Sequence, residues 1–129
     1  MALPVNGTFM DVVYNAQIID VSTASIAQIP VVKSGKLVDG WASISASLTT
    51  GNGTITVKKY PAGVSGSAVT CGTITLVQSG SAAGQSFQLV ITGSEANCTF
   101  AAGDVMALDG DGACDTTCIG RFSMVVRGP

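Results

Sequence analysis

The fold of this chain is decided by residues 41–58, which read Trp41-Ala-Ser-Ile-Ser-Ala-Ser-Leu48, Thr49-Thr-Gly-Asn-Gly53 and Thr54-Ile-Thr-Val-Lys58. Apolar side chains alternate with Ser or Thr in the two outer segments, which is the period of a β-strand with one face on a core. The central segment contains Asn-Gly, a strong hairpin signal because both residues tolerate positive φ. The stretch therefore predicts two strands joined by a turn.

The same two-residue period continues on both sides of this stretch, and turn residues separate the runs. Apolar residues do not recur with helical spacing over three turns free of Gly or β-branched residues. We expect strands near 16–21, 26–32, 36–48, 54–60, 72–78, 86–92, 103–108 and 119–127. Eight strands at this spacing predict an all-β fold, an antiparallel β-sandwich of jelly-roll-like form. Residues 16–129 would be this single domain, and residues 1–15 an N-terminal arm.

The composition excludes several classes of protein. Charged residues make up 11% of the 129 residues, against about 25% in an average domain. Six Lys and Arg against eight Asp and Glu cannot form a basic patch that follows phosphates, so we expect no nucleic-acid partner. The mean hydropathy of +0.48 indicates a chain that folds around a core.

Membrane insertion and secretion are not expected either. Residues 60–94 carry no charge, but glycines, Pro61 and many Ser and Thr interrupt the run, and a spanning helix needs about 20 mainly apolar residues. The first residues lack the basic and continuous apolar regions of a signal peptide. We therefore expect a protein that is made and used without secretion by that route, with no membrane partner.

Motifs for catalysis and cofactors are not found. There is no histidine, which removes the commonest general base and zinc ligand. No Gly-x-Ser-x-Gly elbow and no phosphate-binding loop is present. The acidic segment 109–115 does not fit a calcium-binding EF-hand because its sixth position is Cys114 rather than Gly. We expect no enzyme, no cofactor and no metal site, and the segment is interpreted as an acidic hairpin tip.

The cysteines permit three interpretations. Cys71, Cys98, Cys114 and Cys118 could be free buried thiols, a zinc site or disulfides. Cys114 with Cys118 could close the last hairpin, and Cys71 with Cys98 could link neighbouring loops. Sequence alone does not decide among these, and a reducing cytosol would oppose disulfides.

The surface is suited to contacts with other proteins. The outward positions of the predicted strands are mainly Ser, Thr, Gln and Ala, which lose little side-chain entropy and bury few charges when a partner covers them. The arm contains apolar side chains that could pack on a partner. The candidate partner-binding residues are Leu3, Val5, Phe9, Met10, Val12 and Tyr14.

The order of short segments from Ile29 to the C-terminus resembles the small β-sandwich decoration, or cement, proteins on the heads of tailed bacteriophages. The segments in question are 35–41 (Gly-Lys-Leu-Val-Asp-Gly-Trp), 48–57, 72–76, 80–84 (Gly-Ser-Ala-Ala-Gly), 100–105 (Phe-Ala-Ala-Gly-Asp-Val) and 122–127 (Phe-Ser-Met-Val-Val-Arg). The cysteines and the acidic segment have no counterpart in this pattern.

The resemblance implies a non-enzymatic protein of the virion surface that is made in the cytoplasm of the host cell. Such proteins bind the major capsid protein, often as homotrimers, and staple neighbouring shell subunits together. The arm could then lie along the shell or add a strand to a neighbour's sheet.

Two alternatives come from other classes of protein. A carbohydrate- or receptor-binding sandwich of a phage fibre or tail tip would need exposed aromatic side chains, yet aromatics are 5% of the chain, and the position of Trp41 in an alternating strand predicts a place in the core or at its rim. A self-assembling coat is the other alternative, although an RNA coat would need more basic residues.

Overall fold

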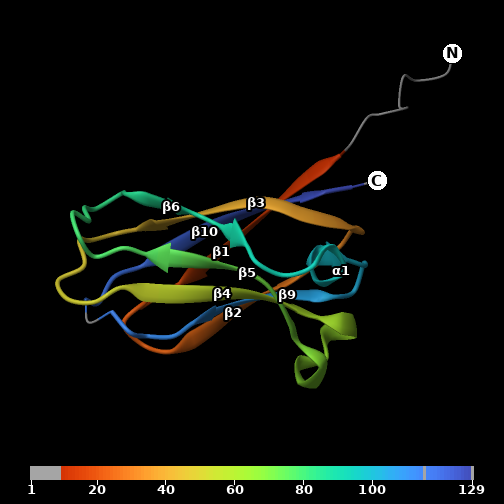
Figure 1. The fold of residues 1–129 in the computed structure, drawn as a ribbon, viewed down its shortest axis with the longest axis horizontal. Coiled ribbons are helices and arrows are strands. Elements are labelled where there is room, and N and C mark those ends of the chain that lie inside the picture. Colours follow the sequence, from red (N-terminus) through yellow and green to blue (C-terminus); the bar gives the residue numbers. More distant parts are fainter. Residues whose placement is uncertain (1–9, 115, 129) are drawn as a thin grey trace, which may run out of the picture.

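Two antiparallel β-sheets form the body of the protein (Figure 1). The computed structural model describes residues 10–114 and 116–128. In chain order the strands are β1 (Asp11–Ile18), β2 (Ser25–Pro30), β3 (Gly35–Ile44), β4 (Gly53–Tyr60), β5 (Val69–Leu76), β6 (Ser86–Gln88), β7 (Val90–Ile91), β8 (Thr99–Phe100), β9 (Val105–Gly110) and β10 (Gly120–Arg127). The short helices are η1 (Pro61–Gly63), η2 (Ser65–Ser67) and α1 (Glu95–Cys98). The predicted all-β class is confirmed, with ten described strands rather than eight.

The strand pairs are nested around one hairpin. One sheet has the order β1-β10-β3-β6, with β8 also on β3, and the other has the order β2-β9-β4-β5-β7. Setting aside the two-residue strands β7 and β8, the fourth strand pairs with the fifth, the third with the sixth, the second with the seventh and the first with the last. These pairs alternate between the two sheets. The chain is therefore a long hairpin folded over into two layers.

The hairpin predicted for residues 41–58 is wrong. β3 and β4 lie in different sheets, so the segment between them crosses from one layer to the other. Gly51 takes the left-handed conformation there (φ 74°), and the side-chain oxygen of Asn52 accepts a hydrogen bond from the Gln78 backbone N–H at 2.8 Å. The turn residues thus fix a crossing that is held against the next loop rather than a hairpin.

Two further predictions need correction for the same reason. The predicted strand 86–92 is two strands, because β6 pairs with β3 while β7 pairs with β5 in the other sheet. The backbone N–H of Leu89, between them, donates to the Gly40 carbonyl at 2.8 Å. β9 and β10 also lie in different sheets, so the acidic segment is not a hairpin tip.

The first strand begins at Asp11, well before the predicted start at residue 16. Its eight residues pair with β10 in continuous register, from Asp11 opposite Arg127 to Ile18 opposite Gly120. Residues 11–15, expected in an arm, are therefore part of the sheet.

The core lies between the sheets and follows the alternation in the sequence. The largest side chains in it are fully buried, and both sheets contribute: Phe100, Phe122, Leu37, Ile44, Ile55, Ile74, Leu76, Met106, Leu108 and Met124. The apolar positions that alternate in the segment 42–48 are buried or partly buried, as predicted.

A β-bulge in β3 reverses the facing of the residues that follow it. Val125 of β10 pairs with Asp39 and Val126 pairs with Leu37, so Val38 is the extra residue. Leu37 points into the core, and after the bulge Gly40 and Ala42 take the inward positions. Trp41 is consequently on the outer face, with 43% of its surface exposed. The predicted core or core-rim place for Trp41 is wrong.

Candidate partner-binding surface

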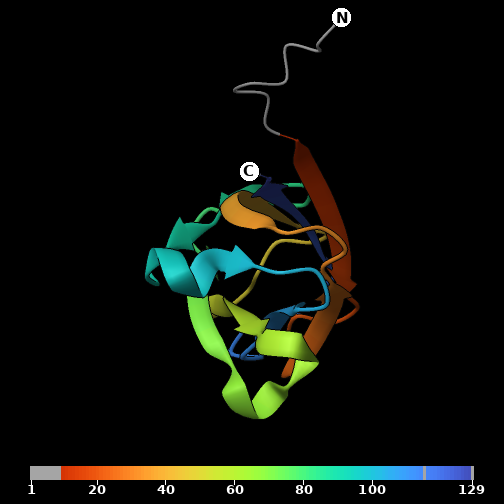
Figure 2. The same cartoon turned by 90° about the vertical axis from the view of Figure 1, so that its right-hand side faces the viewer.

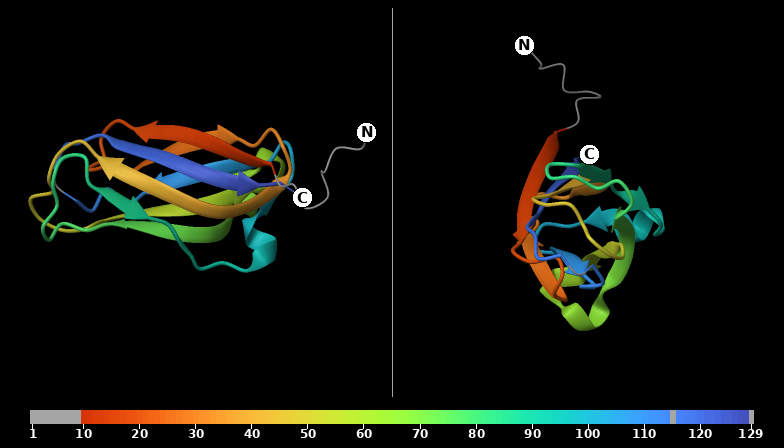
Figure 3. Two further views of the ribbon diagram at one scale, coloured as in Figure 1. Left: turned by 90° about the horizontal axis from the view of Figure 1, so that it is seen from above. Right: turned by 90° about the vertical axis from the view of Figure 1, so that its left-hand side faces the viewer.

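Both described ends of the chain lie at the same end of the sandwich (Figures 2 and 3). The backbone N–H of Gly128 donates to the Met10 carbonyl at 2.9 Å. β2 ends there and β3, β5 and β9 begin there, and α1 and the loop containing η1 and η2 are at the same end. We call this part of the molecule the terminus end.

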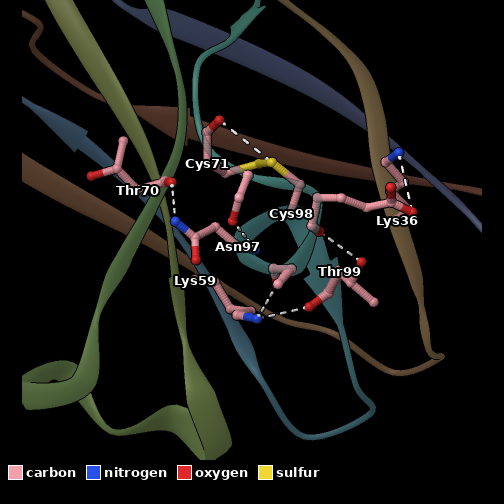
Figure 4. The surroundings of a disulfide bond; sticks show 10 residues. Lys36, Lys59, Thr70, Cys71, Asn97, Cys98 and Thr99 are labelled. Carbon is pink, nitrogen blue, oxygen red and sulfur yellow. Dashed lines mark hydrogen bonds and ion pairs between the residues drawn. A yellow bond between two sulfur atoms is a disulfide. The ribbon is translucent and has the colours of Figure 1, made fainter.

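A disulfide between Cys71 and Cys98 fixes α1 to β5 at the terminus end (Figure 4). The helix is only four residues long, so it needs support from tertiary contacts. Ser94 caps it by accepting a hydrogen bond from the Asn97 backbone N–H at 3.3 Å. The Asn97 side chain in turn donates to the Thr70 carbonyl at 3.4 Å. The pairing of Cys71 with Cys98 was one of the two considered from sequence.

The charged side chains near α1 are used within the molecule. The ammonium group of Lys59 donates to the carbonyls of Ala96 at 2.8 Å and Thr99 at 2.9 Å, and so satisfies backbone acceptors at the end of α1 (Figure 4). Lys36 of β3 forms an ion pair with Glu95, with 3.7 Å between nitrogen and oxygen. Both cations thus tie the helix to the sheets.

A bidentate ion pair joins β1 to β10 beside the chain ends. The Arg127 guanidinium donates to the two carboxylate oxygens of Asp11 at 2.8 and 3.1 Å. This hydrogen bonding lowers the pKa of the Asp11 carboxyl and raises the pKa of Arg127. The pair secures the first residue of β1 to the last residue of β10.

A mainly apolar hollow of about 440 Å³ opens between β3, α1 and the end of β10. Its lining residues are Ser34, Gly35, Lys36, Val38, Glu95, Thr99, Phe100, Arg127 and Gly128. The lining charges are those of the two ion pairs just described, so the hollow holds no unpaired charge from its own lining. A partner could fill it with an apolar side chain without desolvating a free charge.

Exposed apolar side chains stand beside this hollow. Met10 is 57% exposed and Val32 is 74% exposed. Buried Asp104 ties neighbouring loops together: its carboxylate accepts hydrogen bonds from the backbone N–H groups of Ala62 and Ala101, both at 2.9 Å, and its backbone carbonyl accepts one from the Val31 N–H at 2.8 Å. We define the terminus surface as Met10, Val32 and the lining of the hollow.

The six candidate partner-binding residues fall into three groups. Leu3, Val5 and Phe9 lie outside the described residues. Met10 lies on the terminus surface. Val12 packs against the core, and Tyr14 is 7% exposed, with its hydroxyl accepting a hydrogen bond from the Val32 N–H at 3.2 Å. Val12 and Tyr14 thus belong to the body of the domain. Val32 and the hollow were missed, because nothing in the sequence indicates that the 31–34 loop lies beside the chain ends.

The other two cysteines are buried free thiols. Burial raises the pKa of both Cys114 and Cys118, and the neighbouring Cys118 adds to the effect on Cys114. Thiolate is the reactive form, so these groups are poor nucleophiles at neutral pH. The Sγ of Cys114 donates to the Val21 carbonyl at 3.3 Å, which secures the 111–118 connection to the first loop.

In the acidic segment 109–115, Asp109 and Asp111 are engaged by the protein, and Asp115 lies outside the described residues. Asp109 forms an ion pair with Lys58 at 2.8 Å, and Asp111 accepts hydrogen bonds from the backbone N–H groups of Thr54 and Ala113, both at 3.0 Å. Across residues 10–114 and 116–128, no three Cys, Asp or Glu side chains are grouped so that they could hold a metal ion.

No helix in the described part of the chain has the length and apolarity needed to cross a membrane. Comparison with models of protein families and with curated protein sequences finds no match to this chain.

Proposed function

We propose that this chain is a structural protein of a phage virion that binds the outside of the capsid and stabilises it by bridging neighbouring major capsid subunits. The observation that carries the proposal is the terminus surface. It combines exposed apolar side chains, an apolar hollow and internally paired charges at the end of the sandwich where Met10 and Gly128 lie.

The nested strand order supports placing the sandwich in the jelly-roll class, which is common among viral capsid and lectin domains. Pairing of the first strand with the last, the second with the seventh, the third with the sixth and the fourth with the fifth is what a long hairpin rolled into two Greek keys produces. The segment order that resembles phage decoration proteins points to the same class. Fold alone does not establish function, so the proposal depends on the surface.

The terminus surface suits attachment to a protein shell. Contact of Met10, Val32 and the hollow with a partner would remove apolar surface from water, and each Å² removed favours binding by about 25 cal/mol. No free charge in the hollow has to be desolvated when the partner binds. The residues that precede Met10 in the sequence include the apolar Leu3, Val5 and Phe9, which are further candidates for contact with the shell.

Multivalency would make the attachment strong. In a homotrimer, three terminus surfaces engage the shell together, and the effective concentration after the first contact makes the summed binding tighter than any single contact. Neighbouring capsid subunits held by one trimer are then harder to separate under the pressure of the packaged genome. Light scattering of the purified protein should give three times the chain mass of 12.9 kDa.

The test replaces one exposed apolar residue of the terminus surface. Val32→Asp should weaken binding to phage virions that carry this chain, stripped of their native copies, by about tenfold or more, because a carboxylate would have to be desolvated in an apolar contact. Co-sedimentation of added protein with the stripped virions measures the binding. Val32 is 74% exposed, so the fold should be unchanged by circular dichroism.

Ile19→Asp is the matched control. Ile19 is 76% exposed and follows the end of β1 that lies away from the chain ends. It should sediment with virions as the unmodified chain does. Equal binding of the unmodified chain and both variants would show that the terminus surface is not the attachment site.

A further inference from the structure

Trp41 belongs to a row of side chains that crosses four strands on the outer face of the first sheet. In register, Asn15 of β1 faces Ser123 of β10, Ser123 faces Trp41 of β3, and Trp41 faces Gln88 of β6. All four side chains are on the exposed face. Trp41 is the single Trp of the chain, and in the row it lies between Ser123 and Gln88.

Hydrogen bonds within the row orient its polar groups. The Ser123 hydroxyl donates to the side-chain oxygen of Asn15 at 2.8 Å, which leaves the amide NH₂ of Asn15 free to donate. The amide nitrogen of Gln88 donates to Asp39 at 3.2 Å, which leaves the amide oxygen of Gln88 free to accept. The indole therefore has an oriented donor on one side and an oriented acceptor on the other.

A single free cation adjoins this row. Arg121 is on the same face of β10, two residues from Ser123, and makes no hydrogen bond or ion pair with another described residue. Diagonal neighbours across paired strands are about 7–8 Å apart, so Trp41 and Arg121 lie within the reach of one ligand. A shallow hollow of about 440 Å³ lies along β1 and β10 next to the row; its lining residues are Asn15, Ala16, Gln17, Arg121, Phe122 and Ser123.

The arrangement matches the chemistry of an acidic sugar. The C–H face of a pyranose ring carries partial positive charge and packs on the electron-rich face of an indole. Its hydroxyls need both donors and acceptors at the ring edge, and a carboxylate pairs best with a guanidinium. The other charge beside the row, Asp39, already accepts hydrogen bonds from Gln88 and from the Gly40 N–H at 2.8 Å, on the side away from Arg121.

We propose that the Trp41 row with Arg121 binds a carboxylate-bearing pyranose unit of a polysaccharide. The ring stacks on Trp41, its hydroxyls bond to Asn15 and Gln88, and its carboxylate pairs with Arg121. This activity goes beyond attachment to a capsid and does not depend on it.

The single Trp makes its own fluorescence the direct readout. Glycans containing uronate or sialate units, first screened on an array, should change the emission of the unmodified chain in a saturable way, whereas neutral glycans of the same length should bind about tenfold more weakly. Arg121→Gln should remove this preference for acidic glycans and leave the fold unchanged. Lys33→Gln, which removes an exposed cation from the β2–β3 loop, should bind as the unmodified chain does.

Trp41→Ala should weaken the binding of acidic glycans more than tenfold, as measured by calorimetry. The double variant Asn15→Ala with Gln88→Ala keeps the indole and should also weaken the binding of these glycans. Absence of any acidic glycan that binds, stronger binding of neutral glycans, or unchanged binding by Trp41→Ala would overturn the proposal. Virions take no part in these measurements, so this proposal and the capsid proposal can fail separately.

Discussion

Gly72 of β5 is a residue at which the backbone of another strand leaves no room for a side chain. A Cβ atom built there would lie 2.4 Å from the Val90 carbonyl oxygen and 3.0 Å from a methyl carbon of Leu89. β7 could pair with β5 at this point only because the side chain is a hydrogen atom. The close approach attaches the short β7 to the edge of the second sheet.

Gly72→Ala should therefore lower the free energy of unfolding by about 1–3 kcal/mol, because the backbone of β7 has to move. Gly66→Ala is the control, since a Cβ there meets no atom within 4 Å and the φ of Gly66 is not in the left-handed region. It should be neutral or stabilising by about 0.4–1 kcal/mol. Urea unfolding measures both, and equal stability of the two variants would contradict the close approach.

Individual buried positions were predictable where the strand was regular. The alternation placed Ala42, Ile44 and Leu48 in the core, and they are there. The same alternation places Trp41, one residue before Ala42, on the outer face, so its predicted core or core-rim place went against the local phase. The bulge at Val38 shifts the phase earlier in β3, between Leu37 and Asp39, and is set by pairing with β10, more than 80 residues away along the chain.

At the scale of elements, the disulfide determines where α1 lies. It joins residues separated by 27 positions. A cross-link over that distance lowers the conformational entropy of the unfolded chain and so raises the free energy of unfolding by about 3–4 kcal/mol. Replacing Cys71 and Cys98 together by Ala should lower the free energy of unfolding by that amount, measured by urea unfolding.

The control for this prediction is the sensitivity to a reducing agent. The unmodified chain should lose stability when reduced, and the chain without Cys71 and Cys98 should not respond. A chain in which Cys114 and Cys118 are replaced by Ala keeps the cross-link, so it should still respond to reduction. If reduction leaves the unmodified chain as stable as before, the cross-link does not stabilise the fold.

The sequence predicted most of the strands but not their partners. Alternation is a local property, so residues 54–60 and 119–127 were found to within a residue or two as β4 and β10. Pairing is set by the core, and of the described successive strands only β4 and β5 pair with each other. The Gly-rich segments that look like hairpin turns mostly carry the chain from one sheet to the other.

At the scale of the whole molecule, the folded-over hairpin explains why the terminus surface exists. The outermost pair of the nest is β1 with β10, so both described chain ends emerge together, and the ends of the inner strands bring α1 and the 31–34 loop beside them. The partner-binding role of the apolar N-terminal region is a prediction from composition and stays one. Val32 and the hollow, which lie at the same end of the molecule as Met10, depend on this topology and could not be predicted from sequence.

The same topology separates the two proposed activities. The terminus surface lies at one end of the sandwich, while the Trp41 row crosses the middle of one outer face. A copy attached by its end would leave much of that face open to solvent. Attachment to a shell and binding of a glycan are therefore compatible in one molecule.

The central claim is that this chain is a fixed component of a virion, and the composition of purified virions tests it most directly. Quantitative mass spectrometry of virions, purified through a density gradient from a culture that produces this chain, should give a constant molar ratio of the chain to the major capsid protein across independent preparations. The account predicts a ratio that stays the same after a second gradient. Absence of the chain from intact virions, or a ratio that falls with each purification, would contradict it.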